Sequence, residues 1–153
     1  MSCEVKDMKK IIISVLLLVL GIPIVSAESI RSDKLISGFV DGFDTDGIQI
    51  DNVRSHLNLN FNENNGNIGI QLVGKDASLR VSAKIISLSG YDRIYNRWFY
   101  ATGNYLTIKK NKEVKIIDNP IILSNIEGDI MRSYIFSSQN GNIIGYSSWR
   151  ISS

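Results

Sequence analysis

Apolar and polar residues alternate along the middle of this chain. Between Val53 and Asn62, every second position is mainly apolar, and the positions between carry charged, histidine or amide side chains. This period of two is typical of a strand that buries one face and exposes the other. A similar alternation returns after Asn65-Gly66, a dipeptide that favours tight hairpin turns. We therefore predict that Val53–Ile85 forms three antiparallel strands.

The three strands can be paired so that residues of one kind face each other. A turn at Asn65-Gly66 sets Phe61 opposite Ile70. A second turn, at Lys75-Asp76, sets Ile70 opposite Val81. A slip of one residue would move every apolar side chain to the wrong face of the sheet. The pattern thus predicts both the strands and their register.

Shorter apolar runs on either side predict further strands. No segment between residue 28 and the end shows a sustained helical period. We therefore predict an all-β domain, an antiparallel β-sandwich of about 8–10 strands, with a small β-barrel as the alternative. The other strand candidates are Leu35–Phe43, Ile48–Asp51, Trp98–Tyr100, Tyr105–Lys109, Val114–Ile117, Ile121–Leu123 and the hairpin Ile130–Ile151, which turns at Asn140-Gly141.

Two local features refine this picture. In the third strand of the meander, the apolar residues occupy odd positions up to Ile85 and even positions from Ile86. Such a switch predicts a β-bulge, which bends a strand. Further on, we predict a three-residue hairpin loop with Asn111 in the left-handed conformation. That loop would set Ile108 opposite Val114.

The first 27 residues have the pattern of a signal peptide. Lys9-Lys10 precede the apolar run Ile11–Leu20, and Val25-Ser26-Ala27 offers the small residues of a cleavage site. The apolar stretch is shorter than the about 20 residues that a membrane span needs, and it contains Pro23. We predict a signal-peptide helix that is removed on export, with an uncleaved membrane anchor as the alternative.

This segment also bounds the domain and its location. We predict one domain over residues 28–153, secreted or held at the cell envelope, with Met8 as an alternative start of the chain. The only cysteine, Cys3, lies before the signal segment, so the domain has no disulfide. The chain carries 17 basic and 15 acidic residues, a net charge of +2. This balance gives no reason to expect nucleic acid as a partner.

A cluster of aspartates surrounds Gly47. Calcium prefers several carboxylate oxygens on a flexible loop, and Asp-x-Asp-Gly matches the middle of an EF-hand-type loop. However, Gly42 and Val53 occupy the positions of that loop's first and last ligands. We therefore predict that this segment is a solvated Asp-Gly hairpin turn and that the protein binds no cofactor. The alternative is a looser calcium site on Asp41, Asp44, Asp46 and Asp51.

Aromatic residues are concentrated between Tyr91 and Tyr105. A small β domain needs its large side chains inside, so the pattern favours a role in the core. The alternative is a surface platform on which a sugar or peptide stacks, because rings with one polar end are common at interfaces. The candidate ligand-binding residues are Tyr91, Arg93, Tyr95, Arg97, Trp98 and Tyr100.

The polar face of the meander is a further candidate. His56, the only histidine, has Arg54 and Asn58 as neighbours on this face, with no acid or second metal ligand nearby. We predict that it is solvated. Rows of amides and a guanidinium can bind sugar hydroxyls, although a sheet with one solvated face has the same pattern. These residues are Asn58, Asn60, Gln71, Arg80 and Ser82.

The sequence contains no recognisable catalytic motif. It lacks G-x-S-x-G, H-E-x-x-H and a phosphate-binding glycine loop. We therefore predict a non-catalytic binding or structural module whose partner is a carbohydrate or another envelope protein, with membrane contact only through an uncleaved signal segment. The alternatives are a small β-barrel that binds an apolar ligand and a carboxylate-dependent secreted hydrolase.

Overall fold

The computed structural model describes residues 27–41, 47–50, 54–62, 65–90 and 97–151. Within them every regular element is a strand. These residues therefore contain no helix that could cross a membrane. The helix predicted before Ala27 lies outside this part of the chain. The strands are β1 (Ala27–Ser32), β2 (Leu35–Val40), β3 (Ile48–Ile50), β4 (His56–Asn62), β5 (Asn65–Val73), β6 (Ala77–Gly90), β7 (Arg97–Lys110), β8 (Glu113–Asp118), β9 (Ile121–Glu127), β10 (Ile130–Phe136) and β11 (Ile143–Arg150).

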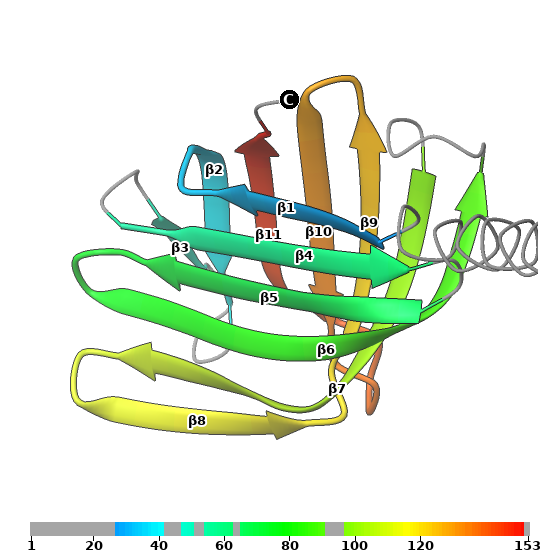
Figure 1. Cartoon of the computed structure of the whole chain (residues 1–153). Coiled ribbons are helices and arrows are strands. Elements are labelled where there is room, and N and C mark those ends of the chain that lie inside the picture. The colour runs from blue at the N-terminus through cyan, green and yellow to red at the C-terminus, as the bar shows by residue number, and fades with distance from the viewer. Residues whose placement is uncertain (1–26, 42–46, 51–53, 63–64, 91–96, 152–153) are drawn as a thin grey trace, which may run out of the picture.

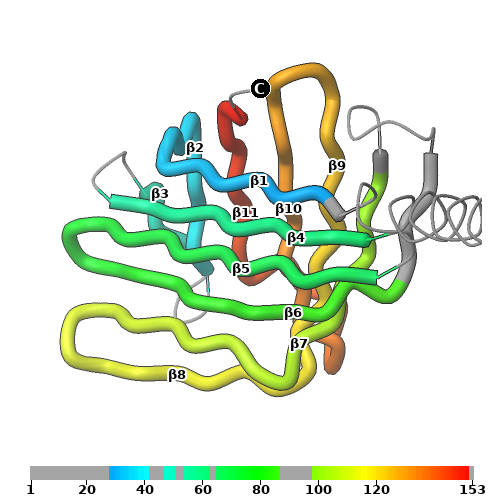
Figure 2. The backbone as a smooth tube through the Cα atoms, in the orientation of Figure 1, coloured from blue at the N-terminus to red at the C-terminus, as the bar shows by residue number. Residues whose placement is uncertain are grey.

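The strands form one antiparallel sheet that curls into a half-barrel (Figures 1 and 2). Their order is β1-β4-β5-β6-β7-β9-β10-β11-β2-β3, and β8 pairs with β7 alone. The prediction of an all-β antiparallel domain is confirmed. The eleven described strands exceed the predicted number because the polar lead-in before Leu35 contains β1, which pairs with β4.

The curl brings two parts of the sheet face to face (Figure 1). We call the part containing β1, β4, β5 and β8 the front layer, and the part containing β9, β10, β11, β2 and β3 the rear layer. The long strands β6 and β7 belong to both. Residues 97–102 of β7 pair with β9 in the rear layer, whereas residues 105–110 pair with β8 in the front layer.

Irregular pairing lets β6 and β7 bend from one layer to the other. The register shifts twice, between Val81 and Ala83 and between Ile85 and Ser87. The second shift confirms the bulge predicted from the sequence, because Ile86 is left unpaired between the pairs Ile85–Ala101 and Ser87–Tyr100. Ile86 itself is 53% exposed and does not join the buried apolar positions as the parity switch predicted. At the bend, a Cβ on Gly103 would lie 2.8 Å from the carbonyl oxygen of Ser82. The bend therefore requires a glycine there, and β7 continues through it.

The core lies between the inner faces of the two layers. On the front layer it is built mainly from leucine and isoleucine side chains that are almost fully buried, and each contributes roughly 1.5–3 kcal/mol. On the rear layer the closest approach occurs at glycines. A Cβ on Gly145 would lie 2.8 Å from Cδ1 of Leu79, and one on Gly38 would lie 3.6 Å from Cδ1 of Leu72. The layers thus pack closely enough to exclude large side chains at these points.

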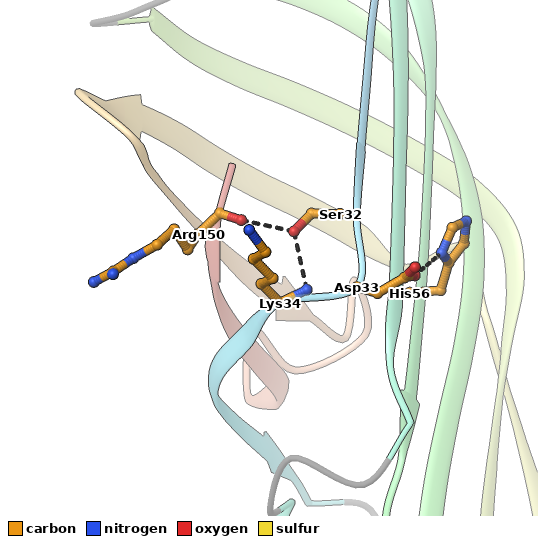
Figure 3. Close-up of polar contacts among 5 residues, drawn as sticks. All are labelled: Ser32, Asp33, Lys34, His56 and Arg150. Atoms are coloured by element: carbon orange, nitrogen blue, oxygen red, sulfur yellow. Dashed lines mark hydrogen bonds and ion pairs between the residues drawn. The ribbon is translucent and has the colours of Figure 1, made fainter. Parts of the chain in front are cut away.

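The turn between β1 and β2 joins the layers a second time (Figure 3). The Ser32 hydroxyl donates a hydrogen bond to the carbonyl oxygen of Arg150 at 2.7 Å and accepts one from the backbone amide of Lys34 at 3.1 Å. The backbone amide of Arg150 in turn donates to the carbonyl oxygen of Lys34 at 2.9 Å. These bonds hold the end of β11 against the turn that leads from the front layer to the rear layer.

The β4–β5 hairpin differs from its predicted register. Ile70 pairs with Leu57, and Phe61 pairs with Gly66. The predicted turn at Asn65-Gly66 is therefore wrong, because both residues lie within β5. The four-residue shift leaves the apolar residues on the same face, so the alternation alone cannot detect it. The predicted pairing of Ile70 with Val81 is confirmed.

Two later hairpins are each shifted by one residue. Asn111 has a φ of 54°, which confirms its predicted left-handed conformation. The β7–β8 loop is one residue shorter than predicted, however, and Ile108 pairs with Lys115. A one-residue slip turns the strand over, so that Val114 is 57% exposed. In the last hairpin, Ile130 pairs with Arg150 rather than with the following residue, as the predicted turn required.

The position of Gly66 leads to a stability prediction. A Cβ at Gly66 would lie 2.1 Å from the carbonyl oxygen of Asn60, whereas a Cβ at Gly69 would meet its nearest atom at 3.9 Å. We expect Gly66→Ala to lower the free energy of unfolding by about 1–3 kcal/mol, because backbone cannot move aside as a side chain can. Gly69→Ala, the matched control in the same strand, should raise it by up to about 1 kcal/mol.

Urea unfolding of the two variants measures both values. Equal effects of the two substitutions would contradict the observed β4–β5 register.

Candidate functional site

The aromatic segment predicted from the sequence lies partly on β7. Trp98 is 45% exposed and Tyr100 is half-buried, while Phe99 between them is buried in the core. The core role predicted for Trp98, Tyr100 and Tyr105 is therefore wrong, because Trp98 and Tyr105 are exposed and Tyr100 is half-buried on the outer face. Arg97 begins β7, where only its backbone is described. The other candidates, Tyr91, Arg93 and Tyr95, lie outside the described residues.

Trp98 and Tyr100 join other large side chains on the outer face of the rear layer. Tyr100 pairs with Leu123 on β9, which pairs with Tyr134 on β10. Tyr134 pairs with Tyr146 on β11, which pairs with Phe39 on β2. These five half-buried residues, which we call the aromatic row, cross five neighbouring strands. Four strand spacings give the row a length of roughly 19 Å.

Ring contacts order the row. The centroids of Tyr134 and Tyr146 lie 5.1 Å apart with the ring planes at 50°, a favourable tilted arrangement. Phe39 lies against the backbone of Gly47, where a Cβ would come within 2.0 Å of its ring. Gly47 has a φ of 59°, so this glycine serves both the turn and the ring contact. The rings are therefore held in place before any ligand arrives.

Rows on either side differ in chemistry. On one side, Trp98 pairs with Asn125, Asn125 with Arg132, and Arg132 with Ser148. We call Asn125, Arg132 and Ser37 on β2 the polar row; Ser148 lies between the last two but is buried. Arg132 also lies 3.8 Å from Glu127, a contact between its Nη1 and a carboxylate oxygen. The row on the other side is largely apolar and consists of Thr102, Ile121, Phe136 and Ile143.

The inner positions of the same strands carry small polar residues. Ser124, Ser133 and Ser147 are fully buried. The hydroxyls of Ser124 and Ser133 share a hydrogen bond of 2.8 Å, and Nε1 of Trp149 donates to the hydroxyl of Ser147 at 2.8 Å. Serine is usually exposed, so the burial of three serines beside half-buried outward tyrosines departs from the common distribution. The sequence signal was therefore present, as large aromatics alternating with serines.

The calcium alternative rests mainly on residues outside the described part of the chain. Asp44, Asp46 and Asp51 lie there. Asp41 is described, follows β2 and donates its backbone amide to the carbonyl oxygen of Ile144 at 3.0 Å. Among the described residues, no group of three or more histidine, cysteine or acidic side chains could hold a metal ion. The calcium site stays a prediction.

His56 has an acidic partner that the sequence did not reveal. Its Nδ1 forms a hydrogen-bonded ion pair with a carboxylate oxygen of Asp33 (Figure 3). The prediction of a histidine without a nearby acid is therefore wrong, because β1 and the turn after it place Asp33 beside β4. Both side chains are largely exposed, and such pairs contribute little to stability. The contact tethers the β1–β2 turn.

No protein-family model, curated protein or solved structure was found to match the chain. The candidate site therefore rests on its own geometry.

The two tryptophans allow a test of the outer face. Trp98 is exposed, whereas Trp149 is fully buried. We expect acrylamide to quench the fluorescence of the protein in part, through Trp98. In the variant Trp98→Phe the remaining emission should be almost resistant to quenching. Emission that stays quenchable in this variant would contradict the assignment of Trp149 to the core and of Trp98 to the surface.

Proposed function

We propose that this domain is a non-catalytic binding module, exported to the cell envelope or beyond it, that binds carbohydrate chains over the aromatic row. The observation that carries this proposal is the unusual distribution of serine and tyrosine side chains in the rear layer. Tyr134 and Tyr146 face outward while the serines next to them in sequence fill the core. These rings are half-buried, and aromatic rings with part of their surface in contact with water are common at interaction sites.

The chemistry of the surface favours a sugar. A pyranose ring presents an apolar face of C–H groups and a rim of hydroxyls. The aromatic row offers ring faces, and the polar row beside it offers amide, guanidinium and hydroxyl groups. The length of the row, roughly 19 Å, fits several sugar units in an extended chain. A flat surface of this kind suits a polymer better than an isolated small molecule.

The charge of the surface favours a neutral chain. The described outward side chains of the aromatic row and the polar row include a single cation, Arg132, which has Glu127 as its ionic neighbour. The paired charge leaves little net attraction for an anionic polymer. Hydrogen bonding and stacking would then supply the affinity.

Another envelope protein is the second candidate partner. Tyrosine and arginine are enriched in protein–protein interfaces, so the same row fits that role. The apolar-ligand alternative has less support, since the buried apolar side chains of both layers form one core cluster in the described part of the chain. The hydrolase alternative remains a prediction that no feature of the described residues favours.

Binding to neutral polysaccharides tests the proposal. We expect the protein to be retained by at least one of cellulose, chitin, starch or xylan, and Tyr134→Ala and Tyr146→Ala each to weaken retention roughly tenfold or more. The control is Val114→Ala, since Val114 is an exposed apolar residue of β8 in the front layer, outside both rows. It should bind as the unchanged protein does.

Failure to bind any of these polymers, or equal loss in the Val114→Ala control, would overturn the proposal. Retention of an envelope protein that is lost in Tyr134→Ala, without polysaccharide binding, would favour the second candidate.

A further inference from the structure

A separate hollow lies on the outer face of the front layer. It has a volume of about 470 Å³ and is lined by residues of β6 and β7. The aromatic row lies on the other part of the curled sheet, so the hollow does not belong to the proposed carbohydrate platform. The lining residues are Arg80, Val81, Ser82, Asn104, Tyr105 and Thr107.

A bulge of β7 opposite Ser82 shapes this hollow. Val81 pairs with Leu106 and Ala83 with Gly103, so Ser82 alone faces two residues of β7. Such an arrangement locally spreads and twists a strand pair. On its other side, Ser82 pairs with Gly69, which has no side chain. The sheet surface is therefore open on both sides of Ser82.

The lining offers one positive charge among neutral hydrogen-bonding groups. Arg80 pairs in register with Thr107, and hydroxyl or amide groups complete the rim. Within the described part of the chain, Arg80 has no ion-pair or hydrogen-bond partner. The described lining also contains no acidic side chain. An exposed guanidinium of this kind is suited to bind a carboxylate with two parallel hydrogen bonds.

We propose that this hollow is a second binding site, which takes a sugar unit bearing a carboxylate, that is, a uronic acid. Arg80 anchors the carboxylate. The hydroxyls of Ser82 and Thr107 and the amide of Asn104 bind the sugar hydroxyls. A volume of about 470 Å³ is within the range of small-molecule sites and admits one or two such units.

Oligosaccharides of galacturonic and glucuronic acid are the probes, and matched oligosaccharides of galactose and glucose are the neutral controls. Titration calorimetry or NMR chemical shifts on the whole domain measure the affinity. We expect the acidic oligosaccharide to bind, and we expect Arg80→Gln to lower its affinity about tenfold or more. Arg80→Lys should restore part of the affinity, because lysine keeps the charge without the fork geometry.

Lys84→Gln is the matched control variant. Lys84 is an exposed cation on the same strand, outside the lining of the hollow. Lys84→Gln also removes one positive charge. We expect the affinity for the acidic oligosaccharide to fall less than about threefold, mainly through weaker long-range electrostatic attraction. Ser82→Ala tests the neutral groups of the lining. It should weaken binding of the acidic oligosaccharide, and that binding should still depend on Arg80.

Three results would overturn this proposal: equal binding of neutral and acidic oligosaccharides, equal loss in Arg80→Gln and Lys84→Gln, or binding of an acidic peptide in place of the uronic acids. Thermal melting of each variant shows that it is folded. The two sites can be told apart, because Tyr134→Ala should leave uronic acid binding intact and Arg80→Gln should leave neutral polysaccharide binding intact.

Discussion

The bend in the β6–β7 pair is the constraint on which the rest of this structure depends. Each strand has 14 residues, and the two pair along almost their whole length while passing from the front layer to the rear layer. Two bulges and the bare backbone at Gly103 make the passage possible. Without it the sheet would stay open, and neither inner face would be covered. The bulge opposite Ser82 also shapes the hollow beside Arg80.

Close packing of the layers decides which side chains face outward. Gly145 and Gly38 lie against leucines of the front layer. Buried serines occupy other inner positions of β9, β10 and β11. The rings of Tyr134 and Tyr146 lie on the outer face, where a cross-strand ring contact orders them, whereas Trp149 of β11 is buried in the core. A substitution that enlarges an inner residue there would disturb the aromatic row as well.

The alternation of the sequence predicts which face a residue occupies better than it predicts its partner. The strand class and the bulge after Ile85 follow from parity alone and are confirmed. The register of β4–β5 does not follow, because a shift of four residues preserves parity. β1 was missed, since residues 28–34 show little alternation and the strand is stabilised by its pairing with β4. Tertiary pairing here overrides a weak local signal.

The candidate site shows the same limit. Trp98 and Tyr100 could be selected from the sequence as members of an aromatic cluster. Their partners could not, because Phe39 and Tyr146 become neighbours only through a strand order that places β2 beside β11. Likewise, Asp33 reaches His56 only through β1. Individual residues with suitable chemistry were visible in the sequence, whereas the surfaces that they form depend on long-range pairing.

The position of β2 has a consequence for how the molecule folds. β2 lies between β3 and β11 in the sheet. β2 is therefore made early but can pair with β11 only after the strands between them in sequence have been synthesised. Loops of this length are slow to close, and sheets dominated by such pairings fold in milliseconds to seconds. A chain still emerging from a ribosome can form the β4–β5–β6 meander, but the β2–β11 pairing of its rear layer must wait until β11 has been made.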